Sequence, residues 1–121
     1  MTRSSTPSPR RGQVWTAYAP GQPDDPHQPR PVLVVSEDVR NVYRHDLMVV
    51  PVFSRGRLGP TRVQLAAGPE GLAHDGVLFC EELTTIDRDF LKDGPLGGTV
   101  GAAVMRAVVR AVRRAIGDVV P

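Results

Sequence analysis

The sequence predicts a mainly β domain: a small barrel of five to seven short strands with one amphipathic helix at its C-terminal end. Two observations carry this prediction. Short β-branched or alternating apolar runs recur between Pro- and Gly-rich turns, and from residue 100 onward the apolar residues adopt helical spacing instead. A chain of 121 residues that is 40% hydrophobic is also of the size and composition of a single globular domain.

The strands are expected where apolar runs are bounded by turn residues, at residues 14–19, 32–35, 47–53, 61–66, 77–80 and 83–86. Between them lie a Pro-rich loop over 20–31 and a polar, irregular segment over 37–46. The third run reads LMVVPVF, and its apolarity indicates a central strand. Pro51 within it has no N–H to donate, which predicts a bulge or a sheet edge at that position.

The helix is expected over residues 100–116. Its apolar side chains fall on one face and four arginines fall on the other, as in a helix that packs on a core. Thr99 is the expected N-cap and Gly117 the expected stop.

The domain is expected to span residues 11–117, with a short tail over 118–121. Residues 1–10 read MTRSSTPSPR and are expected to form a disordered basic tail, because they bury too little apolar surface to offset the entropy of ordering. Residues 1–11 hold three arginines and no acid, whereas the rest of the chain has 12 basic and 13 acidic residues. The pI of about 9.2 is therefore mostly a property of the tail, and it says little about nucleic-acid binding.

Several classes of chemistry find no support in the sequence. The three histidines and Cys80 show no paired metal-ligand spacing, and there is no phosphate-binding glycine loop or dinucleotide fingerprint. We therefore expect no metal and no cofactor. Cys80 ends an apolar strand and is interpreted as a buried small hydrophobe, not a nucleophile. With no membrane-spanning run and one cysteine, we expect a cytoplasmic protein without a membrane partner.

What remains is a group of cationic and hydroxyl side chains at strand ends. Arg30 stands where a polar loop enters an apolar strand, and Ser54, Arg55 and Arg57 stand where another strand ends. Arginine offers a planar fork of donors that suits a phosphate, and a serine hydroxyl adds a neutral donor. On the residues alone, the alternative that these arginines are ordinary solvated loop charges is favoured.

Four segments in order resemble one known family. Residues 11–21 read RGQVWTAYAPG and are similar to the RGDIW/Y…P start of MazF and PemK toxins. Residues 30–38 read RPVLVVSED and resemble the family's RP-led strand. Residues 47–57 read LMVVPVFSRGR and are similar to the strand that runs into its catalytic Thr or Ser. Residues 75–91 read DGVLFCEELTTIDRDFL and resemble its D-x-V-x-x-x-Q-(I/V)-R-T-(L/I)-D segment.

The resemblance implies an SH3-like or CcdB-like barrel, usually a homodimer, that acts as the toxin of a type II toxin–antitoxin pair. It implies metal-independent cleavage of single-stranded mRNA by attack of the 2′-OH, leaving a 2′,3′-cyclic phosphate and a 5′-OH. The family's catalytic Arg corresponds to Arg30 and its catalytic Thr or Ser to Ser54. Contacts to RNA are then expected from Arg55, Arg57 and Arg62. A cognate antitoxin is expected to dock nearby, with acidic residues that pair with Arg55, Arg57 or Arg62 and with apolar side chains.

The chain departs from the family pattern at three places. The first loop reads GQPDDPHQP, and its His27 is a candidate RNA contact or proton-transfer group, although an ordinary loop histidine is the more common case. Glu82 and Thr84 replace the family's Gln and Arg in a segment that contacts bases. Both remain candidate RNA contacts.

Two other functions remain open on the sequence. The CcdB gyrase poison shares this type of barrel without ribonuclease chemistry, because a fold does not fix a function. The Arg30 and Ser54 pair at the strand ends favours the nuclease over that alternative. A catalytically silent barrel that binds RNA or a protein is the other, and the changes at Glu82 and Thr84 leave room for it.

Overall fold

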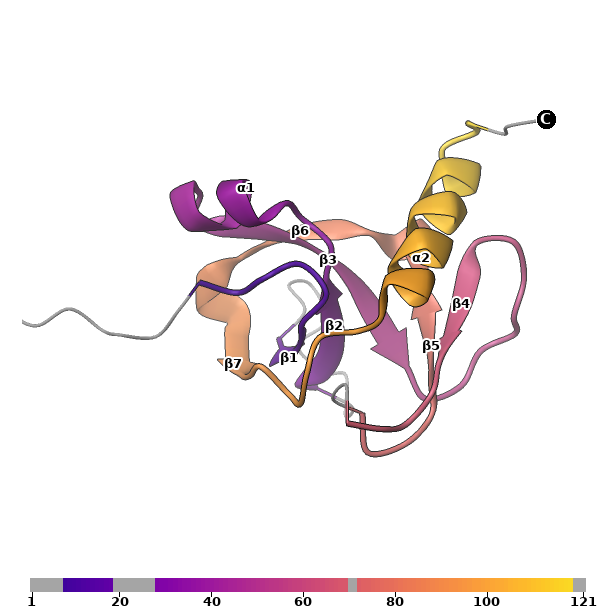
Figure 1. The fold of residues 1–121 in the computed structure, drawn as a ribbon, viewed down its shortest axis with the longest axis horizontal. Coiled ribbons are helices and arrows are strands. Elements are labelled where there is room, and N and C mark those ends of the chain that lie inside the picture. The colour runs from indigo at the N-terminus through magenta and orange to yellow at the C-terminus, as the bar shows by residue number, and fades with distance from the viewer. Residues whose placement is uncertain (1–7, 19–27, 70–71, 119–121) are drawn as a thin grey trace, which may run out of the picture.

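A computed structural model describes residues 8–18, 28–69 and 72–118. It confirms the predicted class, a mainly β fold with a C-terminal helix (Figure 1). In the described residues the strands are β1 (Val14–Ala17), β2 (Arg30–Val34), β3 (Asp46–Phe53), β4 (Arg62–Leu65), β5 (Gly76–Phe79), β6 (Thr84–Asp87) and β7 (Leu91–Asp93). The helices are α1 (Asp38–Tyr43) and α2 (Ala102–Ala115), with short 3-10 turns η1 (Cys80–Glu82) and η2 (Arg88–Phe90).

The strands form one antiparallel sheet in the order β4-β5-β3-β2-β1-β7, and β6 pairs with β3 beside this path. The strand pairs of the described residues do not complete a ring. The term barrel is therefore an approximation. β3 is the central strand, as predicted, because it pairs with β2, β5 and β6.

Pro51 lies at a break in this pairing. On one side of β3, the pairing with β6 ends at Val49 and the pairing with β5 begins at Val52. Pro51 therefore falls between two partners on that side, while it stays opposite Val32 of β2 on the other. A residue without an N–H is tolerated at such a break, since no ladder bond from it is required there.

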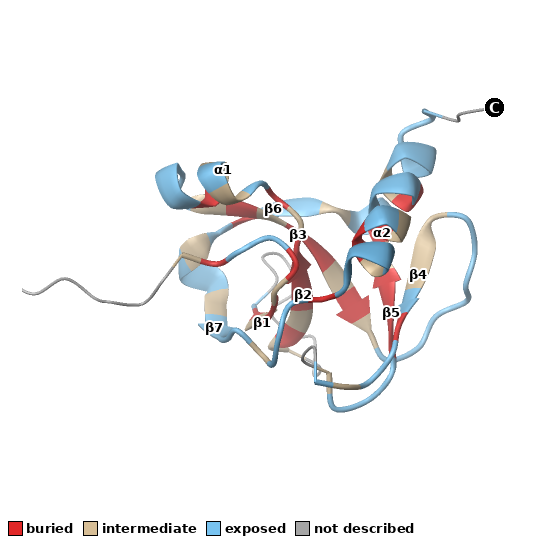
Figure 2. Ribbon diagram, viewed as in Figure 1, coloured by how far each residue is buried: buried red, intermediate tan, exposed pale blue. Residues whose placement is uncertain are grey.

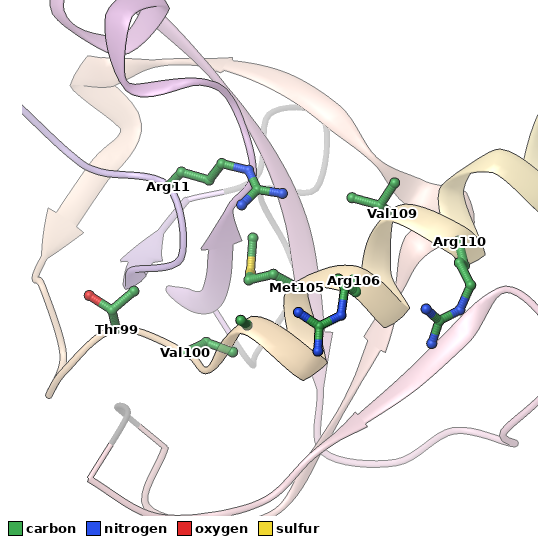
Figure 3. A pocket seen from close by; sticks show the side chains of 8 residues that line it. Arg11, Thr99, Val100, Met105, Arg106, Val109 and Arg110 are labelled. Atoms are coloured by element: carbon green, nitrogen blue, oxygen red, sulfur yellow. The ribbon is translucent and has the colours of Figure 1, made fainter.

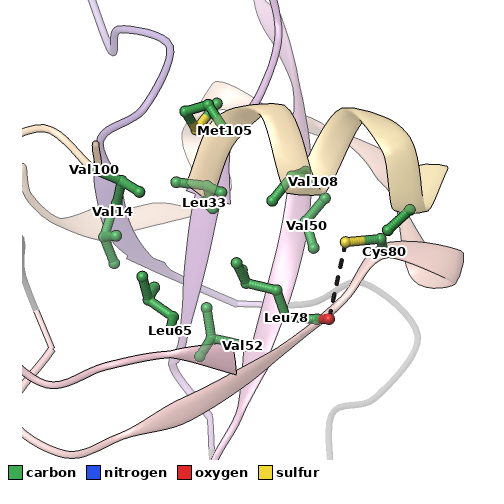
Figure 4. Packing of buried hydrophobic residues seen from close by; sticks show 11 residues of the cluster. Val14, Leu33, Val50, Val52, Leu65, Leu78, Cys80, Val100, Met105 and Val108 are labelled. Carbon is green, nitrogen blue, oxygen red and sulfur yellow. Dashed lines mark hydrogen bonds between the residues drawn. The ribbon is translucent and has the colours of Figure 1, made fainter. Parts of the chain in front are cut away.

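Both faces of the sheet are buried, because successive side chains of a strand point to opposite faces. On one face, a core of eleven buried residues lies beneath α2, which contacts β4 and η1 (Figures 2 and 4). On the other face, a second core contains Trp15, Ala17, Val32, Val34, Leu47, Val49 and Ile86. The continuous apolar runs of β2 and β3 are explained by this arrangement, since neither strand has a solvated face.

The C-terminal helix is shorter than predicted by two residues at its start and one at its end. Its N-cap is Gly101 and not Thr99, and no side chain caps it. Thr99 instead packs its methyl group over Gly12, whose positive φ of 93° and close surroundings suit glycine. Gly117 follows the helix with a φ of 86°, as expected of a residue that ends one.

Two elements differ from the sequence prediction. The segment 37–46 was expected to be irregular, but it contains α1, which a buried polar contact anchors. Asn41 is fully buried, its amide donates to the Ser36 carbonyl (3.0 Å), and the Ser36 hydroxyl accepts from the Met48 N–H (3.1 Å). The strand β7 pairs with β1 and was not predicted, since LKD carries no apolar pattern.

The predicted tail falls partly outside the described residues, which begin at residue 8. Pro9 is buried, and the Arg10 N–H donates to the side chain of Gln13 at 2.8 Å. Packing against the domain therefore includes residues 8–10, three residues before the predicted boundary.

Candidate active site

Arg30 is a nearly buried arginine at the first position of β2, with 9% of its surface exposed. The register of the sheet explains where it points. Val32 of β2 pairs with Pro51 of β3 in an antiparallel register. Two residues along each strand from this pair, Arg30 therefore lies opposite Phe53, on the same face of the sheet. Its guanidinium lies over the Phe53 ring, 4.1 Å from the centroid.

The same face carries a row of four side chains, one from each of the strands β2, β3, β5 and β4. Phe53 packs on Phe79 with ring centroids 4.3 Å apart, and the guanidinium of Arg62 lies 3.8 Å from the centroid of Phe79. We call this set, Arg30, Phe53, Phe79 and Arg62, the cation–aromatic row. Val52 and Leu78 belong to the core under α2, so the alternating neighbours Phe53 and Phe79 face the opposite side. The row holds a guanidinium at each end.

Two adjoining cavities share Arg30 and Phe53 as lining residues. The first, of about 750 Å³, also presents Ser54 and Arg55 from the end of β3, and His74 and Asp75 from the turn before β5. Ser54 and Arg55 are exposed. The structure thus brings together three of the predicted residues, Arg30, Ser54 and Arg55. Two guanidinium groups and a hydroxyl around one cavity form a set of donors suited to a phosphodiester.

The second cavity, of about 320 Å³, adjoins the first at Arg30 and Phe53 and presents Glu82 and Thr84. Both residues were predicted from the sequence as RNA contacts. They belong to η1 and β6, which follow β5 and return the chain to β3. Tyr18 completes this wall, and sequence reasoning had not singled it out.

Arg57 and Arg62 line neither cavity. Arg62 donates from Nε and Nη2 to Glu81 Oε2, at 3.0 and 2.7 Å, and from Nη1 to the Arg57 carbonyl at 3.2 Å. The hydrogen bond from Arg62 lowers the pKa of the Glu81 carboxyl, and the same contact raises the pKa of Arg62. The guanidinium of Arg62 is therefore already engaged by an internal anion.

His27 lies outside the described residues, so its predicted role stays untested. His74 and Asp75 are the residues of the first cavity that sequence reasoning missed. The sequence held no signal for them, because they reach this cavity through the sheet register. Phe53 pairs with Val77, so the residues just before β5 run beside those just after β3. Asp75 also accepts a hydrogen bond from the Ala67 N–H at 2.7 Å, which ties together the two ends of the β4–β5 connection.

Cys80 is buried, as predicted, with 1% of its surface exposed. Within the core under α2, its thiol donates a weak hydrogen bond to the Leu78 carbonyl oxygen, with 3.9 Å between the sulfur and the oxygen (Figure 4). Burial, with a smaller contribution from the negative charge of Glu81, raises the pKa of the Cys80 thiol to about 11. A thiol with that pKa is protonated at neutral pH and is not a nucleophile.

One group of side chains in the described residues has the composition of a metal site. His45 Nε2 lies 3.2 Å from Asp87 Oδ1 and 3.3 Å from Asp89 Oδ1, and all three residues are exposed. They line neither cavity at Arg30. Within the cluster, the Asp89 N–H donates to Asp87 Oδ1 at 2.8 Å.

A third cavity, of about 540 Å³, lies between the N-terminal segment and α2 (Figure 3). Arg11, Arg106 and Arg110 surround an apolar floor that includes Met105 and Val109. None of its lining residues belongs to the two cavities at Arg30. The described part of the molecule therefore has two separate cationic regions. No described helix is long and apolar enough to cross a membrane.

Comparison with known proteins gives a consistent result. The model of the family described as PemK-like, MazF-like toxin of type II toxin–antitoxin system matches residues 10–116. A curated relative, endoribonuclease MazF of Staphylococcus saprophyticus, is 30% identical over 87 residues, which cover 69% of this chain and 72% of the relative.

Solved structures agree. An endoribonuclease from a mycobacterial species is 28% identical with a TM-score of 0.73, covering 98% of this chain and all of the other. A mycobacterial endoribonuclease in complex with its cognate antitoxin is 30% identical with a TM-score of 0.73, covering 94% of this chain and all of the other. MazF in a MazE–MazF complex from Deinococcus radiodurans is 25% identical with a TM-score of 0.71, covering 91% and 96%.

Proposed function

Because this chain belongs to the PemK-like, MazF-like family of toxins of type II toxin–antitoxin systems and is an endoribonuclease, we propose that it cleaves single-stranded mRNA through Arg30 and Ser54 without a metal. The observation that carries this proposal is the position of Arg30. Its guanidinium is held on Phe53 where two cavities meet, so a phosphate seated on it has space for a nucleotide on each side.

The RNA supplies its own nucleophile in this reaction. The 2′-OH attacks the adjacent phosphorus, and the products are a 2′,3′-cyclic phosphate and a 5′-OH. Negative charge grows on the phosphoryl oxygens in the transition state, and oriented donors that meet this charge supply most of the catalysis. Arg30 provides the charged donors and Ser54 provides one neutral hydrogen bond. Arginine holds its proton at all accessible pH values, so the role of Arg30 is electrostatic.

Cleavage of an RNA oligonucleotide in EDTA tests the proposal. The wild-type protein should cut it, and mass analysis should find a cyclic phosphate on the 5′ fragment. Ser54→Ala should slow single-turnover cleavage by up to about 10²-fold, while Ser54→Thr should stay active, because it keeps the hydroxyl and β-branching suits a strand end. Circular dichroism provides the folding control.

The same assay separates the alternatives. Binding of RNA without cleavage, unchanged in Ser54→Ala, would identify a catalytically silent barrel, for which the residues at 82 and 84 leave room. Inhibition of DNA gyrase without RNA cleavage would identify a CcdB-like poison. Loss of activity in EDTA, restored by a divalent ion, would overturn the metal-independent mechanism.

The protein is further proposed to act as a homodimer in the cytoplasm. Three exposed apolar side chains on α1 support a protein partner: Val39, Val42 and Tyr43, with Tyr43 82% exposed. They follow i, i+3, i+4 spacing and so share one helix face. A monomer mass in light scattering that does not change with concentration would contradict the dimer.

A cognate antitoxin is proposed to dock beside the RNA site, placing acidic residues against Arg55, Arg57 or Arg62. Charge reversal at these three positions should weaken antitoxin binding most at low salt, since such contacts act mainly on specificity and association rate. Reversal at Arg106 and Arg110 is the matched comparison. If only that second pair mattered, the antitoxin would lie along α2 instead.

A further inference from the structure

We propose that His74 is the general acid of RNA cleavage and protonates the leaving 5′ oxygen. This inference rests on the proposed function, which needs two proton transfers that its residues do not supply. The 2′-OH must lose a proton and the 5′ oxygen must gain one. Arg30 cannot exchange protons near neutral pH, and a serine hydroxyl does not do so either.

The two cavities at Arg30 contain groups that can perform both transfers. His74 lines the first cavity together with Ser54 and Arg55, and Glu82 lines the second together with Thr84. Attack on phosphorus is in line, so the entering and leaving oxygens lie on opposite sides of the phosphate. Because both cavities are lined by Arg30, we place the entering oxygen of a phosphate on Arg30 in one cavity and the leaving oxygen in the other.

The chemistry of the two side chains, His74 and Glu82, decides which one donates a proton and which one accepts it. A carboxylate is a proton acceptor, whereas an imidazole is the side chain that ordinarily changes charge between pH 5 and 8 and can deliver a proton. The charged groups that share the first cavity with His74 are Arg30, Arg55 and Asp75. The arginines do not release a proton near neutral pH, and the Asp75 carboxylate already accepts a hydrogen bond from the Ala67 N–H. Of these groups, His74 is therefore the one suited to donate a proton.

The step balances as follows. The bond from O2′ to phosphorus forms, and the 2′-OH proton passes to the Glu82 carboxylate. The bond from phosphorus to O5′ breaks, and O5′ takes the proton of the His74 imidazolium. The enzyme is left with a neutral imidazole and a protonated carboxyl, which exchange protons with water before the next cycle.

Single-turnover cleavage over a range of pH tests this assignment. At neutral pH His74→Gln should slow the reaction by about 10²–10⁴-fold. The wild-type rate should fall at high pH, because a general acid must carry the proton that it delivers, and that limb should disappear in His74→Gln. The matched control is His45→Gln, because His45 is also exposed but belongs to the Asp87–Asp89 cluster and lines neither cavity.

An RNA with sulfur in place of the bridging 5′ oxygen gives the decisive comparison. A thiolate leaves without protonation, so the defect of His74→Gln should vanish on this substrate. Added imidazole should also restore part of the activity of His74→Ala on the ordinary substrate. A rate defect caused by misfolding would be relieved neither by the sulfur substrate nor by added imidazole.

The outcomes separate the two proposals. Wild-type rates and an unchanged pH profile in His74→Gln, with Ser54→Ala impaired, would overturn the role of His74 and leave the proposed function standing. An equal defect on the oxygen and sulfur substrates would also overturn it. Absence of cleavage by the wild-type protein on both substrates would overturn the proposed function itself.

Discussion

The cation–aromatic row has an arginine at each end, and the two arginines lie in nearly the same setting. Arg30 stacks on Phe53 and Arg62 stacks on Phe79, and the two rings pack on each other. The difference lies in what surrounds each guanidinium. Arg62 donates twice to a single oxygen of Glu81, whereas Arg30 is nearly buried between two cavities lined by other polar groups. Identical side chains on identical supports thus meet an internal carboxylate at one end and two cavities at the other.

Removing each arginine in turn gives the largest expected contrast. Arg30→Ala should slow cleavage by at least about 10²–10³-fold, because it removes an oriented charged donor from the transition state. Arg30→Lys should recover little, since an ammonium lacks the planar fork. Arg62→Ala should cleave within about threefold of wild type. Single-turnover assays in EDTA measure these rates, and a folded Arg30→Ala protein with wild-type activity would place the active site elsewhere.

The aromatic partners sharpen the comparison. A cation–π contact contributes about 0.5–2 kcal/mol, so Phe53→Leu should reduce cleavage roughly 2- to 30-fold as Arg30 loses its platform. Phe79→Leu alters the support of Arg62 and should change the rate less. Thermal unfolding should detect both variants, which separates loss of packing from loss of positioning. Equal rate defects in the two variants would show that the row acts as one unit.

Salt dependence distinguishes arginines that contact RNA from those that do not. For two to four phosphate contacts, the slope of log K against log salt should be roughly −1.4 to −2.8, at about −0.7 per phosphate of a single strand. Arg55→Gln should make the slope shallower by about 0.7, while Arg62→Gln should leave it unchanged. Glu81→Gln releases Arg62, and a steeper slope in that variant would show that only the internal carboxylate keeps Arg62 from RNA.

The smallest expected effect is on stability. The hydrogen bond from Arg62 lowers the pKa of Glu81 in the folded state. A carboxyl whose folded pKa is lowered contributes stability above its unfolded pKa, and that contribution is lost as the pH falls through the folded value. Wild type should therefore melt slightly above Glu81→Gln at neutral pH, and the difference should close on acidification below the ordinary range of a glutamate. Melting curves at several pH values measure it, and a difference independent of pH would contradict the ion pair as its cause.

The sequence by itself determined the local elements and the residues with suitable chemistry. Short β-branched runs have one stable solution, strands in a sheet, and the helical spacing after residue 100 predicted α2 because both periods follow from backbone geometry. Arg30 and Ser54 could be named in advance because each stands at a strand end next to a recognisable motif. Pro51 likewise marked a break in the ladder, since the missing N–H is a property of the residue itself.

Only the tertiary structure decided which of these residues meet. Arg62 and Arg55 look equivalent in the sequence, and the cross-strand pairing that places Glu81 beside Arg62 is what distinguishes them. His74 lines the first cavity because β5 returns alongside β3 and pairs Val77 with Phe53, a contact between distant positions that no local pattern encodes. α1 formed around Asn41, whose burial depends on Ser36 and β3 rather than on its own neighbours. Propensity and period act over a few residues, whereas register, charge pairing and burial are set by segments distant in the chain, and these place the side chains around Arg30.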